Sequence, residues 1–306
     1  MIWPSGKRFA FTVFDDPDGQ SLETSERVYG FLAETGFRTT KAVWPIGPSK
    51  EANSGGATCA CEPYRRHTLA LQADGFEIAY HLAGPQSSTR QESIQGLERF
   101  REFFGAPPAS MANHYNREAL YWGPDRLSGW RRSMYQLATL GHNSDRFSGH
   151  IEGDAHFWGD ICRSQIRYCR NFVFREINTL RACPQMPYHD PLRPWVNQWF
   201  ASTEGAKGPA FLSAIGEAAQ DALEEQGGAC IMYTHFGHGF VADGQLKPRF
   251  RELMQRLGKK NGWFVPATTL LDHIRQSRNT ETVLTATERS ALEWRWLRQK
   301  LVHGVS

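Results

Sequence analysis

Apolar and polar positions along this chain follow the strand period in some segments and the helix period in others. The first segment with a distinct pattern is a predicted strand. Residues 8–14 read Arg-Phe-Ala-Phe-Thr-Val-Phe, so apolar side chains fall on both sides of an extended backbone. A strand that is apolar on both faces is typical of a parallel sheet covered by helices. Further strands are predicted over residues 38–45, 76–81, 108–114, 171–175, 195–201, 229–235 and 262–265.

Helical periodicity lies between these strands. Residues 22–35 place apolar side chains on one face. Residues 90–104 begin after Thr89, and Glu92 completes the pattern of a capping box. Residues 247–258 repeat the same apolar spacing. Alternating strands and helices predict βαβ units and a mostly parallel sheet, so the fold class is α/β. Seven or eight such units in about 270 residues have the size of a barrel.

The barrel is expected to form one domain over residues 1–280. Residues 281–306 contain a basic amphipathic helix, which we expect to pack on the barrel or on a partner subunit rather than on a membrane. Two segments exceed a minimal barrel. Residues from about 46 to 62 form a long polar loop, and residues from about 141 to 170 are rich in His, Asp and aromatic side chains. The second segment is interpreted as an elaborated loop over the barrel mouth, since long ordered loops often carry function.

Composition narrows the functional classes. A net charge of +3 without a long Lys/Arg run argues against nucleic acid binding. The N-terminus has no apolar signal core and no stretch of about 18 apolar residues occurs, so we expect a cytoplasmic protein without a transmembrane segment. Six cysteines are too sparse for a disulfide scaffold, and reduced thiols are expected. A specific phosphate loop and a Gly-x-Ser-x-Gly elbow are both missing, which disfavours nucleotide-dependent enzymes and serine hydrolases.

Adjacent carboxylates follow the first strand. Asp15 and Asp16 stand at its carboxyl end, where α/β proteins build their sites. Neighbouring like charges raise at least one pKa unless a cation lies between them. A metal ion with a general base beside it therefore explains the pair. The alternative is a turn that caps the helix near Ser21.

Histidines end two further strands. His81 closes the strand at 76–81, in a position equivalent to that of Asp16, and His235 closes the strand at 229–235. Equivalent ends of parallel strands meet at one face of the sheet. Carboxylate and neutral imidazole ligands together suit Zn²⁺ or a similar divalent ion. A purely structural role for a histidine at a strand end is the alternative.

Three segments together resemble a known family. They are Phe14-Asp15-Asp16, Gly75-x-Glu77-Ile78-x-x-His81 and Tyr233-Thr234-His235, and they resemble motifs of the NodB-type polysaccharide deacetylases, which are carbohydrate esterases. The segments occur in the family's order, and the similarity extends loosely over residues 7–275. The resemblance implies a distorted (β/α) barrel and a metal-dependent removal of an N- or O-acetyl group.

The resemblance also implies residue roles. Asp15 matches the family's general base, and Asp16 and His81 match two metal ligands. His235 matches the histidine that protonates the leaving amine. These roles agree with general chemistry, because a carboxylate can take a proton from water and an imidazole can return one near neutral pH.

The chain departs from the family at the remaining ligand. The family's second histidine falls on Pro85, which cannot bind metal, and the family's Arg-containing third motif is replaced by Met111-Ala-Asn113-His114-Tyr115. His114 is a candidate for the missing ligand, with a structural or substrate-binding role as the alternative. Pro17-Asp18-Gly19 replaces the family's Gly-Pro and leaves a spare carboxylate. The candidate substrate contacts are Asn113, Asp18, His238 and Trp122.

The expected function is that of a metal-dependent hydrolase, with zinc as the expected ion. It would cleave the C–N bond of an acetyl group on an acetylated sugar or small sugar conjugate. The expected partners are a small-molecule or oligosaccharide substrate, and assembly with a second copy of the chain stays open. One alternative is another C–N amide hydrolase on the same fold. The other is a non-catalytic protein that binds sugar or takes part in assembly.

Overall fold

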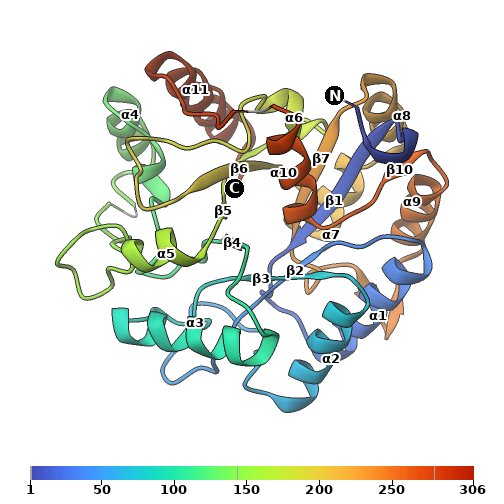
Figure 1. The fold of residues 1–306 in the computed structure, drawn as a ribbon, viewed down its shortest axis with the longest axis horizontal. Helices are drawn as coiled ribbons and strands as arrows, with labels where there is room; N and C mark the ends of the chain where they lie inside the picture. The colour runs from blue at the N-terminus through green and yellow to red at the C-terminus, as the bar shows by residue number, and fades with distance from the viewer. Residues whose placement is uncertain (1, 143, 279) are drawn as a thin grey trace.

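Seven parallel strands close into a barrel surrounded by helices (Figure 1). The structure is a computed structural model that describes residues 2–142, 144–278 and 280–306. Each strand pairs with the next in sequence, and the last pairs with the first over the register Ala10–Ala229 to Asp15–Thr234. The predicted (β/α) barrel is confirmed. Its strands are β1 Phe9–Asp15, β2 Thr40–Val43, β3 Glu77–Tyr80, β4 Ser110–Ala112, β5 Tyr168–Phe174, β6 Gln198–Thr203 and β7 Ala229–Thr234.

The eighth predicted strand lies outside the ring. β10 is shorter than predicted, Gly262–Trp263, and it pairs in parallel with the start of β1. A small antiparallel pair, β8 Val241–Ala242 and β9 Gln245–Leu246, follows the end of β7. Because β1 already pairs with β2 and β7 further along its length, β10 adds to one end of the barrel without entering it.

The helices follow the strands in the expected alternation. Those predicted at 22–35, 90–104 and 247–258 are present within one residue at each end. Thr89 and Glu92 form the predicted capping box. The helices are α1 Leu22–Glu34, α2 Glu62–Ala73, α3 Arg90–Phe104, α4 Trp130–Ala138, α5 Gly159–Gln165, α6 Thr179–Ala182, α7 Gly208–Ala214, α8 Glu217–Gln226, α9 Pro248–Gly258, α10 Ala267–Gln276 and α11 Ala286–His303, with short 3₁₀ turns η1 Pro4–Gly6 and η2 Gly123–Arg126.

The first strand, β1, lies in the core of the barrel. All seven of its side chains are buried, which explains why both of its faces are apolar. The barrel is irregular elsewhere. β3 and β4 share one register pair, Tyr80–Met111, and the pairing of β5 with β6 shifts between Arg170 and Val173. Such an irregularity changes the direction of side chains along a strand, and it lies here beside the polar end of the barrel.

The two segments predicted as long loops differ in the structure. The segment at 46–62 packs on the turn after β1, where Gly19 N donates to Gly55 O at 2.6 Å and Ala57 N donates to Gln20 O at 2.7 Å. The segment at 141–170 is not all loop. It contains α5, of which only Gly159 and Cys162 are buried, and the first residues of β5, and both stretches are too short to show a clear period in the sequence.

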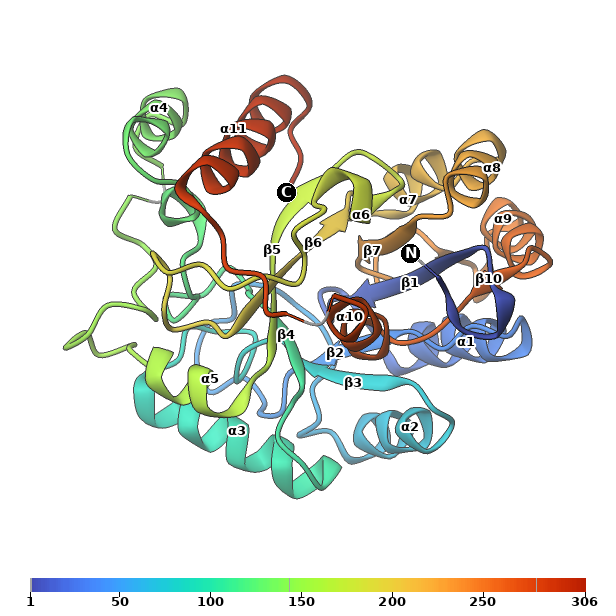
Figure 2. The same cartoon turned by 45° about the horizontal axis from the view of Figure 1, so that its top comes forward.

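The last helix packs beside α4 and against β5 (Figure 2). Glu293 of α11 is fully buried and accepts hydrogen bonds from Ser128 N at 3.0 Å and Ser128 Oγ at 2.8 Å. Arg131 Nε donates to the same carboxylate at 2.8 Å, and Arg193 Nη2 donates at 3.0 Å. One carboxylate thereby joins two chain segments, residues 128–131 and the segment at Arg193, to the helix. Over the described ranges, the structure contains no helix long and apolar enough to cross a membrane.

We predict that Glu293→Gln lowers the free energy of unfolding by about 3 kcal/mol, because it removes the carboxylate that pairs with Arg131 and one of the two that pair with the buried Arg193. The measurement is a urea titration followed by circular dichroism. The exposed Arg298 on the same helix supplies the matched control, and Arg298→Gln is expected to change stability by no more than about 0.5 kcal/mol. Equal stability of the two variants would mean that this carboxylate does not hold α11.

Candidate functional site

Polar side chains at the carboxyl ends of the strands surround one cavity of about 480 Å³. They follow β1, β3, β4 and β7, and one lies within β5. Such a cavity is large enough for a small organic ligand. The lining residues that matter for its chemistry are Asp16, Asp18, His81, His114, Arg170 and His235.

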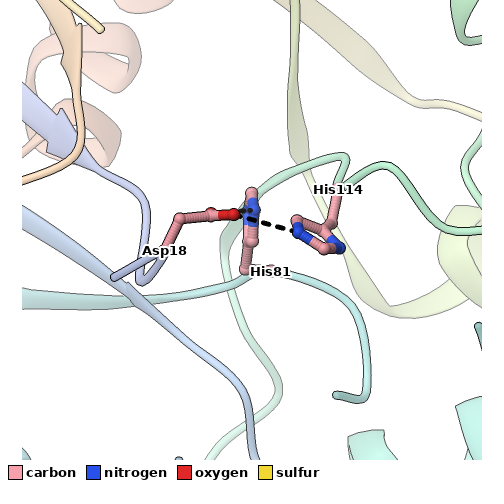
Figure 3. Close-up of side chains that lie close together, drawn as sticks. All are labelled: Asp18, His81 and His114. Atoms are coloured by element: carbon pink, nitrogen blue, oxygen red, sulfur yellow. Dashed lines mark hydrogen bonds and ion pairs between the residues drawn. The ribbon is translucent and has the colours of Figure 1, made fainter. Parts of the chain in front are cut away.

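Three of these residues form a compact cluster (Figure 3). Asp18 points toward both imidazoles, with its Oδ1 3.0 Å from His114 Nε2 and its Oδ2 3.4 Å from His81 Nε2. One potential ligand atom from each residue lies within 4.8 Å of the others. Asp18 Oδ2 and His81 Nδ1 have no hydrogen-bond partner among the described residues. A carboxylate and two imidazoles with atoms left unsatisfied fit a divalent cation such as Zn²⁺.

The ionisation of the cluster agrees with this interpretation. Burial raises the pKa of Asp18, but the hydrogen bonds and charges of His114 and His81 outweigh it and leave the pKa well below the usual value. Burial lowers the pKa of His81 in spite of Asp16 and Asp18. Burial opposes protonation of His114 as well, yet Asp18 raises its pKa. The site favours positive charge between these groups, which a bound cation would supply.

Asn116 sets the orientation of His114. The Asn116 Nδ2 group donates to Gly84 O at 3.0 Å, Gln86 O at 2.7 Å and Glu118 Oε1 at 3.0 Å, so its Oδ1 atom must face the other way and accept. That Oδ1 lies 2.9 Å from His114 Nδ1. In the neutral ring the proton therefore sits on Nδ1, and the Nε2 lone pair points to Asp18.

Asp16 faces the cavity and is held by Arg170. The guanidinium of Arg170 donates to both carboxylate oxygens, at 2.9 Å from Nη1 and 2.5 Å from Nη2. Its charge holds the pKa of Asp16 below the usual value, although burial acts in the opposite direction. His81 Nδ1 is 3.8 Å from Asp16 Oδ1. Arg170 also stacks over the ring of Tyr233, with 4.2 Å between its central carbon and the ring centroid.

Asp15 does not line the cavity. Its carboxylate is completely buried and accepts hydrogen bonds from Tyr29 Oη at 2.9 Å, Lys41 Nζ at 3.0 Å and the backbone nitrogen of Phe236 at 2.7 Å. Lys41 is likewise fully buried. Three donors hold this carboxylate, and Asp16 rather than Asp15 faces the cavity. A catalytic role for Asp15 stays a prediction.

His235 stands at the mouth of the cluster. Its Nδ1 lies 2.8 Å from the carbonyl oxygen of Ala206, which fixes the proton on that nitrogen. Its Nε2 faces the carboxylates, 3.6 Å from Asp18 Oδ2 and 4.0 Å from Asp16 Oδ2. This side chain is 15% exposed, whereas that of His81 is 1% exposed. A ring held in this way can gain or lose a proton on the nitrogen that faces the cavity.

The candidate substrate contacts lie in three different settings. Asn113 lines the cavity, but its amide exchanges hydrogen bonds of 2.9 Å with the backbone of Leu120. Trp122 also lines the cavity. His238 covers the backbone of Gly19 so closely that a Cβ atom on this glycine would lie 2.2 Å from the ring, and it is not among the lining residues. Substrate contact by these residues stays a prediction.

Sequence reasoning missed the cations that balance the two acidic residues. Lys41 and Arg170 each interrupt a buried strand, and a charged residue in such a strand requires a partner of opposite charge. The strand predicted at 171–175 begins one residue after Arg170, so the prediction did not place this charged residue inside a buried strand. Asn116 carries no sequence signal of its own.

Solved structures share this fold at low sequence identity. A protein from Mycobacterium smegmatis described as a polysaccharide deacetylase is 15% identical over 93% of this chain and 96% of its own, with a TM-score of 0.52. One from Pseudomonas aeruginosa PAO1, described likewise, is 12% identical over 91% and 95%, with a TM-score of 0.51. Puue allantoinase is 12% identical over 91% and 94%, also with a TM-score of 0.51.

No protein-family model matches the sequence, and no curated protein matches it. The relation is therefore carried by the fold, which is the one that the three motifs predicted. The chain is a divergent member of the fold shared by the NodB-type polysaccharide deacetylases and this allantoinase.

Proposed function

We propose that this protein hydrolyses a C–N amide bond and releases an acyl group from an acylated amino sugar or a small conjugate of one. The observation that carries the proposal is the cluster of Asp18, His81 and His114 beside Asp16 and His235 in one cavity. Similar folds described as polysaccharide deacetylases and an allantoinase support the same reaction class.

Asp18, His81 and His114 are the residues proposed to hold a divalent cation. The mutual distances of the three residues and the unsatisfied atoms of Asp18 and His81 support this choice over Asp16, whose two oxygens are bound by Arg170. The cation would act as a Lewis acid on the acyl oxygen and make a water proton easier to remove. Two imidazoles and a carboxylate would leave a coordination position open.

Asp16 is the proposed general base, and Arg170 keeps its carboxylate ionised and fixed in one direction. Water attacks the acyl carbon while its proton passes to Asp16. His235, protonated on Nε2, gives a proton to the departing nitrogen as the C–N bond breaks. The products are a carboxylic acid and an amine, so water supplies all the atoms that the bond cleavage requires.

The deciding assay is release of acetate from N-acetylated amino sugars, with and without a chelator. We expect turnover that the chelator abolishes and that Zn²⁺ restores, because Zn²⁺-assisted hydrolysis needs the occupied cluster. Amide hydrolysis that the chelator does not affect would favour the alternative given above, another C–N amide hydrolase on the same fold, acting without a metal. Failure to cleave any acylated sugar or amide would reject both.

Replacement of the two neighbouring carboxylates separates their roles. Asp16→Asn is expected to lower kcat by about 10²–10⁴, since the amide cannot accept the water proton. Asp15→Asn is expected to act mainly on folding, because it leaves the buried Lys41 without its counter-charge. Rates are to be expressed per folded molecule, with the folded fraction taken from circular dichroism. A greater loss of kcat in Asp15→Asn would return the base role to Asp15, as the family resemblance implies.

Zinc affinity tests the ligand set without turnover. His81→Ala, His114→Ala and Asp18→Asn are each expected to remove most Zn²⁺ binding in a calorimetric titration. Asn116→Ala is expected to weaken it by about 10- to 100-fold, because Asn116 orients the imidazole of His114. His303→Ala, at an exposed position, is the control and should bind as the wild type does. Unchanged affinity in His114→Ala would exclude that ligand.

A further inference from the structure

A basic wall closes part of the same cavity. Arg126, the last residue of η2, and Lys300, near the end of α11, both line it together with Trp122 and Trp296. The function proposed above does not use either charge. Trp122 and Arg126 lie in the segment that follows His114, whereas Trp296 and Lys300 come from α11, and none of the four belongs to the cluster of Asp18, His81 and His114.

Arg126 is buried without an Asp or Glu partner among the described residues. It is 2% exposed, and its guanidinium stacks on Trp122 and Trp296, with its central carbon 3.4 and 5.1 Å from the ring centroids. Nη1 donates to the main-chain oxygen of Ser306 at 3.2 Å. Nε and Nη2 have no hydrogen-bond partner within the part of the chain that the structure describes.

The other buried arginines show that this arrangement is exceptional. Arg170 forms an ion pair with Asp16, Arg193 with Asp190 and Glu293, and Arg289 with Asp190. For Arg126, no Asp or Glu within the described ranges lies at ion-pair distance. A buried cation that lacks a partner is unfavourable, and the neighbouring aromatic rings offset only part of this cost.

Neighbouring positive charges make the charged form of Arg126 still less favourable. Burial lowers the pKa of Arg126 to about 9, and the positive charge of Arg170 acts in the same direction. Burial and Arg126 also lower the pKa of Lys300. Glu204 is the carboxylate that favours the charge of Lys300, but its two oxygens already accept from the backbone nitrogens of Ala206 and Ser306. Two side-chain cations, Arg126 and Lys300, therefore face the cavity, and no Asp or Glu of the described residues lies at ion-pair distance from either.

We propose that the substrate carries an anionic group, a carboxylate or a phosphate, which Arg126 and Lys300 bind in this cavity. The inference rests on the proposed function for the reaction itself, and it adds the class of substrate: an acylated amino sugar that also bears a negative charge. Guanidinium and ammonium groups are the side chains that bind carboxylate and phosphate most strongly. An anion on the substrate would accept hydrogen bonds from Nε and Nη2 of Arg126, which have no acceptor among the described residues.

Matched substrates test the proposal. The set is N-acetylglucosamine, its 6-phosphate and N-acetylglucosaminuronic acid, which share the acetamido group and differ in charge. We expect kcat/KM for at least one anionic member to exceed that for the neutral sugar by roughly 10- to 100-fold, the effect of one or two charge-assisted hydrogen bonds. The phosphate and carboxylate arms identify which anion is used. Equal kcat/KM for all three would overturn the anionic subsite while leaving the deacylation reaction standing.

Variants of Arg126 and Lys300 test whether these two side chains cause the preference for anionic substrates. Arg126→Gln and Lys300→Gln are each expected to reduce the ratio of anionic to neutral kcat/KM by about 10-fold or more, mainly through KM. Lys300 is partly exposed, so its variant provides the test if Arg126→Gln does not fold. Arg298→Gln, an exposed change two residues earlier on α11, is the control for charge alone. A ratio unchanged in Lys300→Gln and Arg126→Gln would overturn the proposal.

A binding measurement separates this inference from the reaction. Glucosamine 6-phosphate and glucosaminuronic acid, compared with glucosamine by calorimetry, report the anion contact without turnover. Tighter binding of an anionic sugar that is lost in Lys300→Gln would support the subsite even if no acetate were released from any substrate. No tighter binding of either anionic sugar would overturn it, in which case stacking on Trp122 and Trp296 and the contact to Ser306 suffice for Arg126.

Discussion

Two neighbouring carboxylates at the end of β1 impose a constraint that the rest of the site satisfies. Asp15 and Asp16 are adjacent in sequence and both are buried, so each requires its own cation. Lys41 on β2 supplies one charge and Arg170 on β5 supplies the other. Because side chains alternate along a strand, the two carboxylates point in different directions and reach different partners. These ion pairs join β1 to its neighbour and to a strand across the barrel.

The alternation of strand and helix patterns was enough to predict the barrel. The apolar run of β1 and the capping box at Thr89 express local preferences that the tertiary structure also uses. The strand predicted at 262–265 is longer than β10 in the structure. An apolar segment does not show whether the strand beside it is already paired along most of its length, as β1 is. The start of β5 was missed, because Arg170 breaks the apolar pattern and its partner lies 154 residues away.

The site was predictable as a set of strand ends but not as a set of contacts. His81, His114 and His235 could be assigned to one face from topology alone. The choice between Asp15, Asp16 and Asp18 depended on the turn at Pro17, whose direction brings Asp18 back toward the two imidazoles. Asn116 could not be found from the sequence, since its role arises from acceptors on Gly84, Gln86 and Glu118 that together fix which way its amide faces.

The cavity is lined both by the strand ends of the barrel and by a helix that lies outside the barrel. The cluster of Asp18, His81 and His114 belongs to the first half of the barrel, and β7 closes the ring by Thr234. Trp296 and Lys300 come from a helix added to the outside of a completed ring. Substitutions in that helix can therefore change the shape and charge of the cavity wall without altering the strand ends. Because α11 is held by contacts with α4 and β5, the wall and the strand ends depend on separate sets of interactions.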